Sequence, residues 1–237
     1  MNRVINQAAG AARRRRAITA AVAAAAVTPA AAASFQYAYD DGVSNITAGP
    51  AGFDADVLWG NYFTAQPGAE TITTIRFGFG GWGDGIGSPT PPVTVYLFED
   101  ADDDFDPTTN TLPIASVTTS ATDTGLSGFI DVDLPTPTTV SGGFFVAVRT
   151  FARDGLDLVT RRDPDARADR SWLFYDGSIS PNNLGGSPFI LPLDTPGVPF
   201  PGAFNIRAIG VPTPGTVALG ALALGLVVAP TGRRRTR

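Results

Sequence analysis

Two short stretches, Val93-Thr-Val-Tyr-Leu-Phe98 and Ile130-Asp-Val-Asp-Leu134, alternate apolar and polar residues. Successive side chains of an extended chain point to opposite faces, so the apolar residues of each stretch share one face. In the second stretch Asp131 and Asp133 take the opposite face. A period of two predicts β-strands with one face in a core and the other in water.

The rest of the body, residues 34–210, contains further stretches rich in β-branched or aromatic residues and bounded by Gly, Pro or Asp. The body has no helical spacing of apolar residues over a twelve-residue window. We therefore predict an all-β, antiparallel β-sandwich, jelly-roll-like, in one domain. The predicted strands are Phe35–Tyr39, Val57–Thr64, Glu70–Phe79, Val93–Glu99, Pro113–Thr119, Gly128–Leu134, Gly143–Phe151, Trp172–Tyr175 and Phe204–Ile209.

Two connections are longer than the others. Residues 153–170 mix arginine and aspartate, which predicts a solvated loop whose charges neutralise one another. Residues 177–202 are rich in proline. Loops of this length are uncommon and often serve a function.

The composition excludes several kinds of chemistry. The chain of 237 residues contains no His, no Cys and no Lys. It therefore has no His/Cys zinc site, no Ser-His-Asp or Cys-His nucleophile, no Schiff-base lysine and no disulfide. Nine of the 17 arginines lie at the two ends, which leaves eight against 22 acidic residues in the body. Such an acidic body repels phosphate backbones, so we expect no nucleic-acid partner.

The N-terminal residues 1–33 have the pattern of a secretory signal peptide. Arg13–Arg16 precede the mostly apolar run Ala17–Val27, and small residues at Ala30–Ala33 offer a cleavage site before Ser34. The apolar run is too short to span a bilayer as a helix. The alternative is a disordered alanine-rich tail.

The C-terminal residues 211–237 combine three elements in order. A proline motif is followed by the apolar run Val217–Ala229 and by an arginine cluster at the end of the chain. The motif consists of Val211, Pro212, Thr213, Pro214, Gly215 and Thr216, and the cluster of Arg233, Arg234, Arg235 and Arg237. At about 1.5 Å per residue the run reaches about 20 Å, short of the bilayer core. Without further information it is a weak tail anchor with its arginines in the cytoplasm.

This order of elements resembles the PEP-CTERM sorting signal of Gram-negative bacteria. Thr213 stands where that family usually has Glu, which resembles the variant of planctomycete-type proteins. The resemblance implies export by the secretion machinery and a membrane-associated intermediate with a short hydrophobic helix. It also implies recognition by an exosortase, with exopolysaccharide as a further partner.

The body resembles an uncharacterised secreted domain that precedes such tails. The resemblance rests on an ordered set of pieces: Tyr39–Gly42, Trp59–Phe63, Val93–Asp100, Gly142–Val146, Arg170–Trp172 and Asn205–Gly210. It implies a secreted β-sandwich and assigns no catalytic residue.

An acidic run carries the candidate metal site. Asp100, Asp102, Asp104 and Asp106 lie at alternate positions, as oxygen ligands do in short Ca²⁺ loops. Phe105 stands where an EF-hand needs Gly, so the run is no EF-hand. We expect a solvated hairpin loop without a cofactor, and a Ca²⁺ loop is the alternative.

The aromatic residues offer one candidate glycan contact, Trp82, which lies in a glycine-rich loop. The alternative is a ring folded over the edge of the core. Trp59 and Trp172 lie in predicted strands, where we expect them to belong to the core.

A glycosidase would need paired carboxylates, and neither Glu70 nor Glu99 pairs with an Asp by spacing. We therefore expect no catalysis. The expected function is structural or adhesive, at the surface or in the exopolysaccharide matrix of a Gram-negative-type bacterium. The alternative is a carbohydrate-binding module that uses Trp82 and nearby loops, with or without Ca²⁺.

Overall fold

The computed structural model describes residues 33–44, 46–48, 53–80, 92–153, 159–166, 169–175, 177–196 and 202–212, which all belong to one compact unit. These residues form antiparallel β-sheets, and their only helix is the short 3₁₀ turn η1 (Leu184–Gly186). The predicted all-β class is confirmed. The signal peptide before Ala33 and the predicted C-terminal helix lie outside the described residues.

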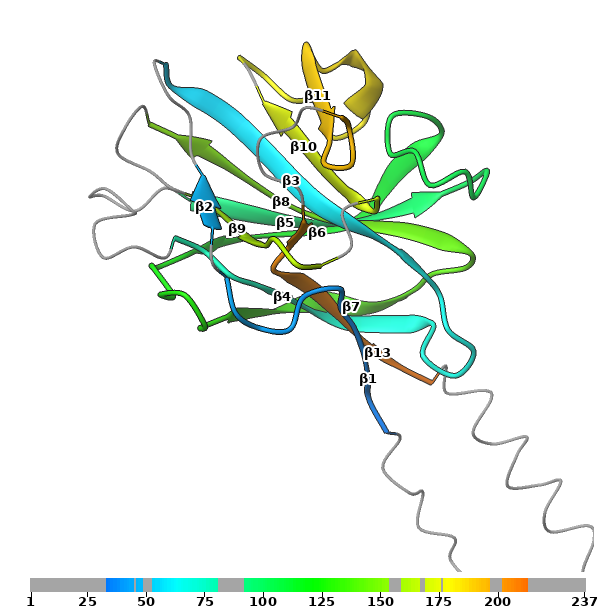
Figure 1. Cartoon of the computed structure of the whole chain (residues 1–237). Helices are drawn as coiled ribbons and strands as arrows, with labels where there is room; N and C mark the ends of the chain where they lie inside the picture. The colour runs from blue at the N-terminus through cyan, green and yellow to red at the C-terminus, as the bar shows by residue number, and fades with distance from the viewer. Residues whose placement is uncertain are drawn as a thin grey trace, which may run out of the picture. The chain divides into compact units, whose positions relative to one another are not determined.

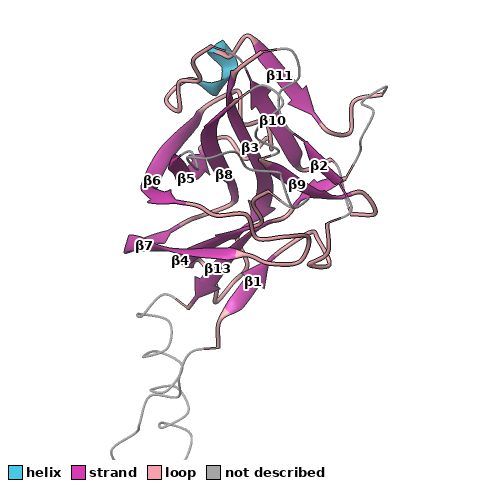
Figure 2. Ribbon diagram, turned by 90° about the vertical axis from the view of Figure 1, so that its left-hand side faces the viewer, coloured by secondary structure: helices cyan, strands magenta, loops and turns pink. Residues whose placement is uncertain are grey.

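Two sheets form the sandwich (Figures 1 and 2). The six-stranded sheet has the order β11 (Phe189–Pro192), β10 (Ser171–Tyr175), β3 (Ala55–Thr64), β8 (Gly143–Ala152), β5 (Pro92–Asp100) and β6 (Thr111–Ser120). The four-stranded sheet has the order β1 (Phe35–Tyr37), β13 (Ile206–Val211), β4 (Thr71–Phe77) and β7 (Ile130–Thr139). A third, small sheet has the order β12 (Ala203–Phe204), β9 (Thr160–Asp163) and β2 (Ile46–Ala48).

The two alternating stretches supply facing parts of the core. Val93, Val95 and Leu97 of β5 are fully buried, and Val132 and Leu134 of β7 are buried opposite them in the same apolar cluster. This cluster joins the inner faces of the six-stranded and four-stranded sheets. The predicted inward face is confirmed in both strands, but the other face of β5 is not in water, because Phe98 is buried in a second apolar cluster and Tyr96 packs against it.

The central strand β3 is buried on both faces. Trp59 packs in the inner core, where its ring stacks on Phe79 with centroids 6.3 Å apart. Leu58 and Tyr62 face the other way, into a second apolar cluster on the outer face of the six-stranded sheet. Trp59 is therefore in the core as predicted, whereas Trp172 on β10 is half-buried against the second cluster.

Each predicted strand overlaps an observed strand, and the structure adds β2, β9 and β11. The strand β9 lies in the segment predicted as a solvated loop, yet Arg161 and Arg162 are 0% and 4% exposed. Burial lowers the pKa of Arg162 to about 10, so this guanidinium remains charged at neutral pH.

The environment of Arg161 explains why a charged side chain is buried there. Its guanidinium donates hydrogen bonds to the carbonyl oxygens of Leu126 and Gly128 and to Oγ1 of Thr124, at 2.9 Å for the last. A Cβ on Gly78 would lie 2.7 Å from Nη1 of Arg161, so glycine leaves the space that the guanidinium occupies. Alternating charges in the sequence do not reveal such distant acceptors.

Candidate functional site

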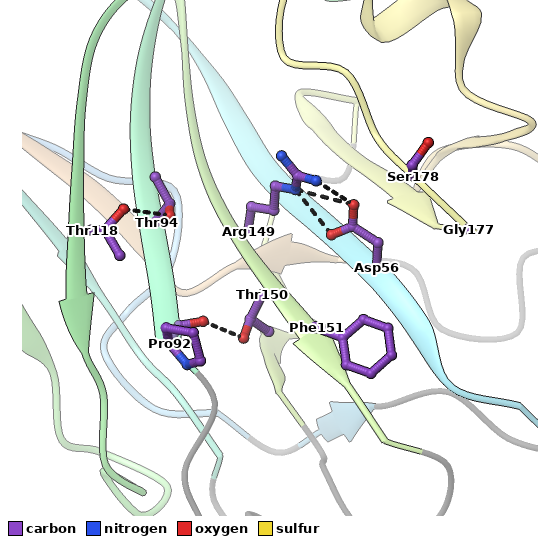
Figure 3. Close-up of a pocket in the computed structure, with 9 residues that line it drawn as sticks. All are labelled: Asp56, Pro92, Thr94, Thr118, Arg149, Thr150, Phe151, Gly177 and Ser178. Atoms are coloured by element: carbon purple, nitrogen blue, oxygen red, sulfur yellow. Dashed lines mark hydrogen bonds and ion pairs between the residues drawn. The ribbon is translucent and has the colours of Figure 1, made fainter.

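A groove lies on the outer face of the six-stranded sheet, with a volume of about 360 Å³ (Figure 3). Strands β3, β5, β6 and β8 form its floor, and the segment after β10 forms one wall. Its lining residues are Asp56, Pro92, Thr94, Thr118, Arg149, Thr150, Phe151, Gly177 and Ser178.

An ion pair between Asp56 and Arg149 lies in the groove (Figure 3). Nε of Arg149 donates to both carboxylate oxygens at 2.9 and 3.1 Å, and Nη2 donates to Oδ2 at 2.6 Å. The backbone N–H of Ile179 also donates to Oδ2, at 2.9 Å. The hydrogen bonds that Arg149 donates to Asp56 raise the pKa of Arg149. Both charges are therefore held in fixed positions by charge-assisted hydrogen bonds.

A second depression, of about 430 Å³, lies beside the first along β5 and β6. Thr94 lines the first depression, and Tyr96 lines the second. These two residues are two positions apart on β5 and therefore lie on the same face of the strand. Pro181 and Asn182, from the segment after β10, close the far side. The two depressions form an elongated surface, which we call the outer groove.

Polar groups line most of the outer groove, and one exposed aromatic ring, that of Phe151, lies at its rim. Thr94 and Thr118 share a hydrogen bond of 2.9 Å between their hydroxyls, across the β5–β6 pair. Phe151 is 52% exposed and lies two residues from Arg149 on the same face of β8. Hydroxyl, amide and guanidinium groups beside an exposed ring can hold a sugar chain through hydrogen bonds and ring contact.

The acidic run forms a hairpin loop between β5 and β6. One carboxylate oxygen from each of Asp100, Asp102 and Asp104 lies within 4.8 Å of the others. Asp106 is not part of this group; its Oδ1 accepts hydrogen bonds from the N–H and hydroxyl of Thr108 at 2.8 and 2.6 Å. The structure therefore brings together three of the four predicted ligands.

The loop lies against the second apolar cluster. Phe105 packs edge-on against Tyr62, with ring centroids 5.4 Å apart, and the guanidinium of Arg170 lies 3.7 Å from the centroid of the Phe105 ring. The residues Asp103 and Phe105 have positive φ angles of 56° and 64°. The backbone therefore turns sharply here, which brings alternate carboxylates to one side.

The two glutamates, Glu70 and Glu99, lie in different parts of the structure and have different hydrogen-bond partners. Oε1 of Glu70 accepts the N–H of Gly68 at 2.9 Å, and such backbone hydrogen bonds lower the pKa of this carboxyl. Glu99 accepts a hydrogen bond of 3.4 Å from Ser141. A glycosidase acid needs a raised pKa, so the direction at Glu70 is opposite to that requirement.

The remaining predicted site residues lie largely outside the described residues. Trp82, the predicted glycan contact, is among them, as are Thr213–Thr216 and the terminal arginine cluster. Val211 is the last residue of β13, and Pro212 follows it directly.

The outer groove was not predicted. Asp56 and Arg149 are 93 positions apart, and only the pairing of β3 with β8 brings them together. The one signal in the sequence is the spacing of Arg149 and Phe151, which places a cation and an aromatic ring on one face of a strand.

No protein-family model matches this chain, and no curated protein matches it. Two solved structures of Cwp84 match part of this chain, each with a TM-score of 0.46. The clostridial cysteine protease Cwp84 after propeptide cleavage is 16% identical, over 76% of this chain and 40% of that chain. The cysteine protease and lectin-like domains of Cwp84, a surface layer associated protein of Clostridium difficile, are 17% identical, over 76% of this chain and 36% of that one.

This chain spans well under half the length of those two chains. It contains no cysteine, so it has no nucleophile for cysteine-protease chemistry. In the part of the chain that the structure describes, no helix has the length and apolar character needed to cross a bilayer.

Proposed function

We propose that this chain is an exported, non-catalytic protein with a structural or adhesive role at the cell surface or in the exopolysaccharide matrix. The observation that carries the proposal is the Asp56–Arg149 pair in the outer groove. Asp56 supplies the only carboxylate among the described lining residues of both depressions, and Arg149 pairs with it. A groove with fixed charges and hydroxyl groups is suited to binding rather than to general acid catalysis.

A dedicated carbohydrate-binding module is the second candidate, and the exposed ring of Phe151 favours it. The two candidates differ in selectivity. An adhesive matrix protein contacts polysaccharide weakly and broadly, whereas a module binds one sugar epitope with saturation. A glycan array with the secreted chain separates them, since a saturable signal on one glycan class supports the module.

A binding experiment tests the outer groove itself. We expect Phe151→Ala to weaken sedimentation of the protein with insoluble polysaccharide about tenfold, because loss of a ring contact removes about 1.4 kcal/mol. Phe189→Ala is the matched control, because Phe189 is 51% exposed but stacks on Tyr175 outside the groove. Equal binding by wild type and Phe151→Ala would contradict a role for the groove.

Sorting by an exosortase is the part of the proposal that rests on residues 211–237. We expect a variant with both Pro212→Ala and Pro214→Ala to insert in the membrane but to escape processing. A larger, membrane-bound form should then accumulate in a host with an exosortase, detected by immunoblot of membrane and extracellular fractions. A simple tail anchor predicts the same size and distribution for wild type and variant.

A further inference from the structure

We propose that the free edge of β6 pairs with β6 of a second copy of this chain, so that two six-stranded sheets join into one antiparallel sheet. The inference does not depend on the proposed function, because it needs no polysaccharide. β6 is the end strand of its sheet, and β5 is the only described strand that pairs with it. Figure 2 shows β6 at the margin of that sheet. An end strand presents a row of unpaired N–H and C=O groups, which another strand can pair with.

The other described sheet edges carry features that prevent such pairing. β1, β2 and β12 are only two or three residues long, and β11 is four residues long and ends at Pro192. β7 is ten residues long, but it contains Pro135 and Pro137 and exposes Asp131 and Asp133. Short strands, prolines and charges keep an exposed edge from pairing with another chain.

β6 has few of these features. It is ten residues long and contains no charged residue, and its one proline, Pro113, lies near its start. Residues 114–120 therefore form an uninterrupted stretch without proline, glycine or charge. A long, uncharged edge strand is a place where chains associate. Among the described sheet edges, β6 is thus the one that is open to a partner strand.

The inner face of β6 fits a second copy of the same strand. Ala115 and Val117 are half-buried there and pack against the apolar cluster between the two sheets. Antiparallel pairing about a twofold axis at Val117 places Val117 of one copy opposite Val117 of the other, and Ala115 opposite Thr119. The pairing would therefore cover apolar side chains that are left partly open at the margin of each core.

The charge of the chain also favours a contact through β6. The body holds eight arginines against 22 acidic residues, so two copies repel one another over most of their surface. On the outer face of β6, Ser116 of one copy would lie opposite Thr118 of the other, and neither side chain carries a charge. A strip without charge is the place where two acidic copies approach at the lowest electrostatic cost.

The arrangement closes at two copies. Both copies use the same strand, so the contact is symmetric and leaves no second β6 edge free. The two ends of the joined sheet are the β11 edges, which are short and end in proline. We therefore expect a dimer rather than a fibre.

Sedimentation velocity of the full secreted chain, from about 1 μM to about 1 mM, tests the proposal. We expect a reversible monomer–dimer equilibrium that shifts toward the dimer as salt screens the repulsion between the acidic bodies. Ser116→Lys with Thr118→Lys should weaken dimerisation about tenfold, because like charges would lie directly opposite one another. Both side chains are exposed, so this variant should still fold. The matched control is Thr136→Lys with Thr139→Lys, which makes the same charge change at exposed positions on β7 and should dimerise like wild type.

A charge-swap mixture tests whether one β6 faces another. Ser116→Glu with Thr118→Glu should also weaken dimerisation, and an equimolar mixture of the lysine and glutamate variants should form heterodimers. Both variants stay acidic overall, so their net charges do not attract one another.

Three results would overturn the proposal. The first is a wild type that stays monomeric over the whole concentration range. The second is a dimer that the lysine substitutions on β6 weaken no more than those on β7, since another surface would then form it. The third is a pair of β6 variants that stay monomeric when mixed, since the substituted positions would then not face each other across the contact.

Discussion

The strands β9 and β4 both carry arginine, yet they place it in opposite environments. Arg161 on β9 is completely buried and donates to backbone carbonyl oxygens of a distant loop. Arg76 on β4 has a side chain that is 34% exposed, and it pairs with Asp131 across the β4–β7 ladder. The sequence around Arg161 is the more highly charged of the two.

The difference between Arg161 and Arg76 shows that local charge density does not determine whether an arginine is buried. Arg161 is buried because residues 124–128 offer acceptors and Gly78 offers space. Arg76 stays at the surface because it lies on the outward face of an edge pair, with Ile75 and Phe77 turned into the core. Variants at four arginine contacts test this conclusion. They are taken from the most buried contact to the most exposed, and each is expected to lower the free energy of unfolding.

The largest effect is expected for Arg161→Met. The substitution keeps an apolar stem but removes the donor that the carbonyl groups of Leu126 and Gly128 and the hydroxyl of Thr124 share. The free energy of unfolding should fall by about 3 kcal/mol. Denaturant unfolding measures it. Arg161→Lys is the control, because an ammonium retains the charge without the planar fork. A lysine variant as stable as wild type would show that the guanidinium geometry is unimportant.

The next effect is expected at Asp40, which binds Arg207 in a pair whose side chains are 0% and 12% exposed. Asp40→Asn keeps the shape but replaces charge-assisted hydrogen bonds, so the free energy of unfolding should fall by about 2 kcal/mol. A double-mutant cycle with Arg207→Met measures the coupling. Additive losses in that cycle would contradict a direct contribution from the pair.

A smaller loss is expected for Asp56→Asn in the outer groove, where Arg149 is 28% exposed. We expect about 1–2 kcal/mol, because solvent partly screens the pair while the hydrogen bond from Ile179 persists. Thermal unfolding at low and high salt measures the change. A loss as large as that of Arg161→Met would show that the groove is more strongly coupled to the core than its exposure indicates.

The smallest effect is expected for Asp131→Asn, at about 0.2–1 kcal/mol, because both partners are exposed. Hydrogen bonding to Arg76 lowers the pKa of Asp131 in the folded state. The difference between wild type and variant should therefore be complete above the unfolded pKa of about 3.9. It should vanish as the pH falls through the lower folded pKa. Unfolding measured from pH 7 to pH 2 checks this, and a constant difference would contradict it.

The strands of the sandwich were predictable because alternation is a local property. In β5 and β7 the period of two is visible in the residues themselves, and burial of one face follows from it. The strands β2, β9 and β11 were missed because they are only three or four residues long, and β9 and β11 also lie in a charged and a proline-rich segment. The pairing of β2 with β9 also joins segments more than 100 residues apart.

The candidate sites also combine features that follow from the sequence with features that only the tertiary structure shows. The sequence by itself determined that Asp100, Asp102 and Asp104 lie on one loop, because the three residues are close neighbours in the chain. The tertiary structure alone decided that Tyr62 lies under that loop and that Asp56 meets Arg149. It also decided that the arginines of β9 are buried. These contacts depend on strand register and on which segments cover a face, and a shift of one residue would turn each side chain to the opposite face.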